Sequence, residues 1–136
     1  MKICQRILLQ LGLAAGITLL AGCSGMTNPF AKPATPEQTA ARKELNAGVD
    51  LYNAGDYAGA IKLLGGSADI WKADKPIQLD ALKYMAFSYC VTGKQALCKQ
   101  QFEKAVKLDP SFDLAPGEKG HPLWEPVFDK VKKGSH

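Results

Sequence analysis

The chain has 136 residues, a formal net charge of +4, and 46% hydrophobic and 22% charged residues. These values suit one globular domain and exclude a disordered chain, a collagen-like chain and a large multidomain enzyme. Four cysteines are too few for a scaffold that depends on many disulfides.

The first 22 residues have the pattern of a secretory signal peptide. Lys2 and Arg6 form a basic start, an apolar run extends from Ile7 to Leu20, and small residues follow. The run is too short to span a bilayer comfortably. We therefore predict that residues 1–22 form a signal helix that is cleaved off and does not belong to the fold.

The end of this segment, Leu20-Ala21-Gly22-Cys23, resembles the lipobox of bacterial lipoproteins at all four positions. The resemblance implies cleavage before Cys23, a diacylglycerol on its thiol, and an acyl chain such as palmitate on the new amine. Two or more such chains anchor a protein stably. Ser24 follows instead of Asp, which by the sorting rule of these lipoproteins implies the outer membrane, with the folded domain expected in the periplasm. The alternative is an ordinary signal peptide followed by an incidental cysteine.

Loss of Lys2 and Arg6 with the signal leaves 15 basic and 13 acidic residues, a net charge of +2. This balance, without a basic cluster interleaved with aromatic residues, predicts no nucleic-acid partner. The dense basic group Lys130, Lys132 and Lys133 suits the last turn of a helix, where cations interact favourably with the helix dipole. A patch for lipid headgroups is the alternative.

Residues 23–36 contain three prolines and several small polar residues, which predicts a flexible, semi-extended tether. At ~3.1 Å per residue it would reach on the order of 40 Å from the membrane. Thr35-Pro36-Glu37-Gln38 then has the pattern of a helix start, with a Thr cap and Pro in the first turn. We expect residues 37–136 to form one helical domain.

The domain is predicted to be all-α, because no alternating run is long enough to indicate a sheet. Turns are expected at Gly55-Asp56 and Thr92-Gly93, and a loop is expected around Trp71 and Pro76. The helices are expected at about residues 36–54, 57–64, 77–91, 96–108 and 122–133. The last would start at Pro122 or Pro126 and bury one face made of Leu123, Trp124, Val127, Phe128 and Val131.

The first four helices repeat with an offset of 38 residues. The matching positions are Gly48, Leu51, Gly55, Ala60 and Leu64 in the first copy, and Ala86, Tyr89, Gly93, Cys98 and Phe102 in the second. The second copy resembles the tetratricopeptide repeat without gaps, at Leu82, Met85, Ala86, Tyr89, Gly93, Cys98, Phe102, Ala105 and Pro110. The first copy fits less well, because Ser67 replaces Ala and no Pro falls in place.

The resemblance spans about residues 39–112 and implies two helical hairpins. Because two repeats are few for a stable stack, the fifth helix is expected to cap them, with Trp124 and Phe128 in the core. In this family the first helix of each repeat lines a concave groove. The groove positions here are Arg42, Leu45, Val49, Tyr52, Lys83, Phe87 and Val91.

This predicted lining suits an amphipathic helix or an extended peptide of a protein partner, anchored by Tyr52 and Phe87. The alternative is that the chain's own fifth helix or tether fills the groove.

Cys90 and Cys98 are the other cysteines of the mature chain, and export places them in an oxidising compartment. Their positions in the repeat permit a disulfide across the hairpin, which would contribute ~2 kcal/mol because the loop is short. The alternative is two buried small residues. A metal site is not expected, because the spacing is not Cys-x2-Cys and the only histidines are His121 and His136.

No catalytic motif is present, so we predict no enzyme, no catalytic residue and no cofactor. His121, between Gly120 and Pro122, is expected to be a cap or surface residue.

From about residue 80 to residue 128 the chain, with its paired cysteines, resembles small tetratricopeptide lipoproteins associated with type VI secretion clusters. Its matching residues are Asp109, Pro110, Ser111, Phe112, Leu114, Pro116, Glu118, Gly120, His121, Pro122, Leu123, Trp124, Pro126, Val127 and Phe128. The resemblance implies an accessory scaffold of the secretion machine. The alternatives are a pilotin-like carrier of an outer-membrane secretin or other assembly subunit, and an activator of a cell-wall enzyme.

Overall fold

The computed structural model describes residues 34–134. The predicted signal peptide, the acylation site Cys23 and the tether up to residue 33 lie outside the described residues. Within residues 34–134 the regular structure is entirely α-helical, which confirms the prediction that this domain is all-α. The helices are α1 (Pro36–Asn53), α2 (Tyr57–Gly66), α3 (Ala68–Lys72), α4 (Lys75–Val91), α5 (Gln95–Leu108) and α6 (Glu125–Gly134).

The start of α1 follows from its sequence. The backbone N–H of Gln38 donates to the Thr35 hydroxyl (3.2 Å), and the backbone N–H of Thr35 donates to the Gln38 side chain (2.9 Å). This reciprocal pair satisfies two N–H groups that the first turn leaves without helical partners. Pro36 fills the first helical position, where a missing N–H costs nothing.

Two segments differ from the sequence predictions. Trp71 was expected in a loop but lies in α3, a short helix that forms because Ser67 caps it and Ile70 is fully buried. Pro76, expected in the same loop, lies in the first turn of α4. At the other end α6 begins only at Glu125, and Leu123 precedes it with 41% of its surface exposed. The prediction that Leu123 shares the buried face of the last helix is therefore wrong.

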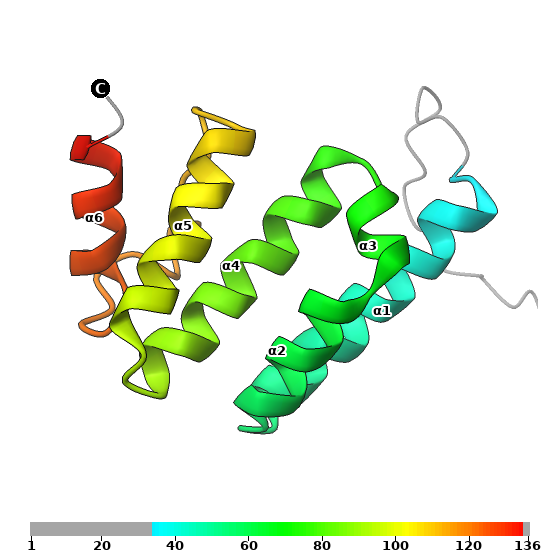
Figure 1. The fold of residues 1–136 in the computed structure, drawn as a ribbon, viewed down its shortest axis with the longest axis horizontal. Helices are drawn as coiled ribbons and strands as arrows, with labels where there is room; N and C mark the ends of the chain where they lie inside the picture. Colours follow the sequence, from blue (N-terminus) through cyan, green and yellow to red (C-terminus); the bar gives the residue numbers. More distant parts are fainter. Residues whose placement is uncertain (1–33, 135–136) are drawn as a thin grey trace, which may run out of the picture. The chain divides into compact units, whose positions relative to one another are not determined.

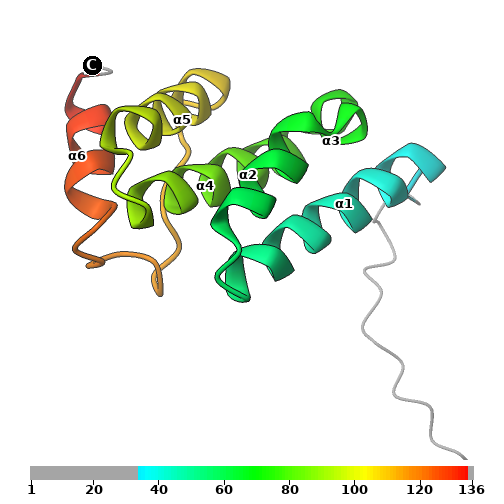
Figure 2. The same ribbon diagram turned by 60° about the horizontal axis from the view of Figure 1, so that its bottom comes forward.

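The helices stack in chain order, as Figures 1 and 2 show. α1 packs against α2, α2 against α4, α4 against α5, and α5 against α6. α1 also contacts α4, and α3 contacts both of them. Each helix thus buries its apolar face against its near neighbours along the chain.

The turns α1–α2 and α4–α5 make the same backbone hydrogen bonds 38 residues apart. Gly55 and Gly93 both adopt positive φ angles, 82° and 74°, which glycine tolerates without steric cost. In the α1–α2 turn the backbone N–H groups of Gly55, Asp56 and Ala60 donate to the carbonyls of Tyr52, Leu51 and Asp56, respectively. In the α4–α5 turn those of Gly93, Lys94 and Cys98 donate to the carbonyls of Cys90, Tyr89 and Lys94. The repeat seen in the sequence is therefore also a repeat of turn geometry.

The helices of each of these pairs meet through a small residue facing a large one. In the first pair Gly48 of α1 lies so close to Leu64 of α2 that an added methyl group would overlap the Leu64 side chain. Ala86 and Phe102 hold the corresponding positions in α4 and α5, and both are fully buried.

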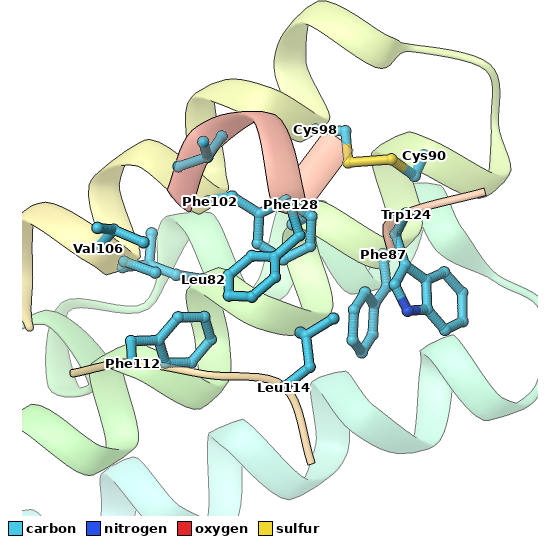
Figure 3. Packing of buried hydrophobic residues seen from close by; sticks show 13 residues of the cluster. Leu82, Phe87, Cys90, Cys98, Phe102, Val106, Phe112, Leu114, Trp124 and Phe128 are labelled. Atoms are coloured by element: carbon cyan, nitrogen blue, oxygen red, sulfur yellow. A yellow bond between two sulfur atoms is a disulfide. The ribbon is translucent and has the colours of Figure 1, made fainter. Parts of the chain in front are cut away.

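Buried side chains form two clusters. One fills the space among α4, α5, α6 and the segment before α6, around Phe102 and Phe128 (Figure 3). The other joins α1, α2, α3 and α4 around Leu64 and Ile70. Trp71, Tyr84 and Tyr89 contact both clusters, so the two halves share a continuous interior.

We predict that Gly48→Ala lowers the free energy of unfolding by roughly 1–3 kcal/mol, because the new methyl group overlaps Leu64. This loss outweighs the helix propensity gained, which is about 1 kcal/mol. Urea denaturation of the oxidised chain measures the change.

Gly66→Ala is the matched control, since no atom lies within 4 Å of the Cβ it would add. It should leave the stability unchanged or slightly raised. Equal effects of the two substitutions would contradict the close approach of α1 and α2.

Candidate functional site

The face of α4 that was predicted to line a groove is covered by the chain itself. The segment of residues 109–124, here called the returning segment, connects α5 to α6 and lies against this face. Trp124 stacks on Phe87 with ring centroids 4.2 Å apart and an interplanar angle of 27° (Figure 3). Phe87 retains only 2% of its surface exposed. It is a core residue in this structure.

The prediction of an open apolar groove is therefore wrong at two of its positions. Phe87 is covered by Trp124, and Leu45 is 3% exposed because it packs into the cluster around Leu64 and Ile70. The alternative prediction, that the chain itself covers this face, agrees with the structure. The part that covers Phe87 is the returning segment, whereas the alternative named the fifth helix or the tether. Of the other predicted positions, Arg42 is exposed, whereas Val49, Tyr52, Lys83 and Val91 are half-buried.

The returning segment is bound to both α4 and α6. The Lys83 ammonium lies 2.9 Å from the Glu118 carboxylate, and the Trp124 indole N–H donates to the Glu118 carbonyl at 2.9 Å. Near the start of the segment, the carbonyls of Phe112 (3.0 Å) and Pro110 (3.2 Å) accept hydrogen bonds from the Lys132 ammonium of α6. Lys132 thus binds the returning segment, a role that its place in a basic cluster did not indicate.

His121 covers the outer face of Trp124. Its ring lies parallel to the indole at a centroid distance of 3.3 Å, and its Nδ1 accepts a hydrogen bond from the Leu123 N–H. Trp124 is therefore sandwiched between His121 and Phe87. These contacts assign His121 a packing role in the described part of the chain.

Tyr52 of α1 completes the aromatic group beside the returning segment. Its ring contacts those of Tyr57 (5.5 Å), Tyr84 (5.4 Å) and Phe87 (6.2 Å). Burial raises the pKa of the Tyr52 hydroxyl, and the nearby Tyr57, Tyr84 and Glu118 raise it further. Tyr52 therefore stays protonated at neutral pH.

Lys83 is the charged centre of this region. Burial alone would lower the pKa of its ammonium, but the hydrogen bond and charge of Glu118, helped by Asp80, outweigh burial and raise the pKa. Lys83 is therefore charged at neutral pH and pairs with Glu118 across two segments that are far apart in sequence.

Sequence reasoning placed Trp124 in the core but missed its partner Phe87 and missed the Lys83–Glu118 pair. Glu118 lies among turn residues without helical or strand periodicity, so no local pattern predicted its contact with α4.

Cys90 and Cys98 form a disulfide between α4 and α5, with their Cα atoms 5.2 Å apart. Both are buried, at 1% and 0% exposure. The two predictions for this pair, a disulfide and two small buried residues, are therefore compatible, since the bonded cysteines are also small and buried.

The described residues contain no group of three or more His, Cys, Asp or Glu side chains arranged to hold a metal ion. None of the helices formed by residues 34–134 is long and apolar enough to cross a membrane. No protein-family model, curated protein or solved structure matches the chain.

We predict that Trp124→Ala lowers the free energy of unfolding by about 3–5 kcal/mol, because it removes a buried indole that fills the space over Phe87. Leu123→Ala, one residue earlier and exposed, should change it by less than about 0.5 kcal/mol. Urea denaturation followed by circular dichroism compares the two. Small and equal effects would mean that the α4 face is open in solution.

The Lys83–Glu118 pair predicts a specific pH dependence. The pKa of Lys83 is raised in the folded chain, so its stabilisation is complete below the ordinary value of 10.5 and is lost as the pH rises through the raised pKa. Lys83→Met should therefore cost about 1–2 kcal/mol of unfolding free energy at neutral pH.

The difference between wild type and Lys83→Met should shrink at high pH, measured by urea denaturation at steps above 10.5. Lys62→Met, at an exposed position of α2, is the control and should show a small difference at every pH. A Lys83 effect that does not change with pH would show that packing of the side chain, and not its charge, holds the returning segment.

Proposed function

We propose that this chain is a bacterial lipoprotein, anchored in the outer membrane by acylated Cys23, whose helical domain is a tetratricopeptide-like module that binds a protein partner without catalysis. The observation that carries the proposal is the repetition of turn geometry in the two hairpins α1–α2 and α4–α5. Membrane attachment rests on the lipobox resemblance of residues 20–23.

Three further features support a repeat module. The helices contact near neighbours in chain order, which is the arrangement of solenoid proteins. The small-against-large contact of Gly48 with Leu64 has its counterpart at Ala86 and Phe102. Such stacks need a cap at the end, and α6 packs against α5 in the place where a cap is required.

We further propose that the module is an accessory scaffold of type VI secretion whose partner belongs to the secretion or envelope assembly. The support is the resemblance of about residues 80–128 to small lipoproteins of such clusters. The residues that carry this resemblance include the buried Phe112, Leu114, Trp124 and Phe128, together with Glu118. The resemblance therefore includes the part of the chain that closes the stack.

The experiment is a mild-detergent pull-down of the tagged, acylated chain from its own cells, with partners identified by mass spectrometry. We expect sheath, baseplate or envelope components of the secretion machine. A Cys23→Ser variant is the control. It should fail to incorporate radiolabelled palmitate and should leave the outer-membrane fraction. Cys4→Ser should still incorporate palmitate and remain in that fraction.

Recovery of a secretin in place of these components would replace the scaffold proposal by the pilotin alternative. Recovery of a cell-wall enzyme, with higher activity in the presence of the chain, would replace it by the activator alternative. If Cys23→Ser still incorporates palmitate, the proposed anchor is wrong.

A further inference from the structure

A groove on the surface of the domain lies between α5 and α6. It has a volume of about 590 Å³, within the range of sites that hold a short peptide or a small molecule. The nearly buried side chains of Val106 from α5 and Val131 from α6 line it, and Pro110 lies beside them. Its floor is therefore apolar.

The groove is a consequence of the direction of α6. Phe102 contacts Phe128 at 5.1 Å, and one turn later in both helices Val106 and Val131 line the same hollow, so α5 and α6 run in the same direction (Figure 1). The returning segment makes this possible, and Lys132 ties it to α6. The two walls are thus fixed before any partner arrives, which lowers the entropy cost of binding.

The rim of the groove is basic. Lys99 and Lys107 of α5 stand on one side, and Lys130 of α6 on the other. The one carboxylate in the lining, Glu103, is bound to Lys99 at 2.6 Å. Lys107 and Lys130 make no hydrogen bond or ion pair within residues 34–134, so their charges are available to a partner.

We propose that the α5–α6 groove binds an acidic segment of a partner protein, with an apolar side chain on Val106 and Val131 and carboxylates beside Lys107 and Lys130. This inference rests on the proposed function and names the face and the partner chemistry. It places the partner in the α5–α6 groove and not on the α4 face, which the returning segment covers.

The shape of the site favours a peptide over a membrane surface. A flat layer of lipid headgroups would contact the lysine ammonium groups but would not reach the valines of the floor. An acidic peptide with an apolar side chain satisfies both features, because opposite charge fixes its position and the apolar contact excludes water.

The test is a titration of the full acylated chain, held in zwitterionic detergent and labelled on its valine methyl groups. The probe is a capped synthetic peptide in which leucines are flanked by glutamates. We expect the methyl signals of Val106 and Val131 to shift, while that of Val49 in α1 stays in place. The affinity should fall as salt is added, because exposed charges are screened.

The matched variants carry the same change of charge at different places. Lys107→Glu/Lys130→Glu should weaken peptide binding about tenfold or more, since both rim charges become repulsive. Lys43→Glu/Lys62→Glu, at exposed positions of α1 and α2, should change it by less than about twofold. A peptide with glutamine in place of glutamate should bind the native chain more weakly than the acidic peptide does, because it loses the attraction of the rim charges.

The absence of shifts at Val106 and Val131, or equal weakening by both double variants, would overturn the proposal. So would phosphatidylglycerol vesicles that shift the same valines and displace the peptide, because the site would then serve a lipid surface. In the pull-down, partners that persist undiminished in Lys107→Glu/Lys130→Glu would overturn the groove while leaving the proposed function intact. A selective shift of the two valines supports the groove even where the pull-down recovers nothing, so the two failures are distinguishable.

Discussion

The arrangement of the C-terminal half depends on the stacking of Trp124 on Phe87. Two helical hairpins leave one face of α4 without a helix to cover it, and an exposed phenylalanine there would lose the benefit of burial. The returning segment supplies the cover, and the Lys83–Glu118 pair and the indole hydrogen bond to the Glu118 carbonyl fix its path. A loop that makes these contacts is part of the core and not a flexible connection.

The same stacking determines the direction of the last helix. A short turn after α5 would send the next helix back antiparallel, as in the turns at Gly55 and Gly93. The returning segment instead carries the chain to the far end of α5 before α6 begins, and Phe128 then meets Phe102 while Val131 meets the level of Val106. Filling the α4 face thus opens a different groove, between α5 and α6.

Local signals in the sequence predicted most of the helices but not these long-range contacts. The Thr35 cap and the glycines at 55 and 93 act through their own backbone neighbours, so helix ends near them were predicted within a residue or two. α3 was missed because its five residues are too few to show a period, and burial of Ile70 stabilises it. Phe87 was assigned to a groove because the sequence of α4 alone does not indicate that Trp124 covers it.

The lysines of the C-terminal half divide into two groups by what they contact, and this division bears on where a partner binds. Lys83 and Lys132 are bound to acceptors of the returning segment, so the fold itself accounts for their presence. Lys107 and Lys130 line opposite sides of the groove, and within residues 34–134 neither makes a hydrogen bond or an ion pair. Exposed like charges across a groove repel each other, and an anionic occupant would turn that cost into attraction. The disulfide joins α4 to the first turn of α5, and Trp124 stacks on α4, so the α5 wall of the groove is attached to the rest of the core.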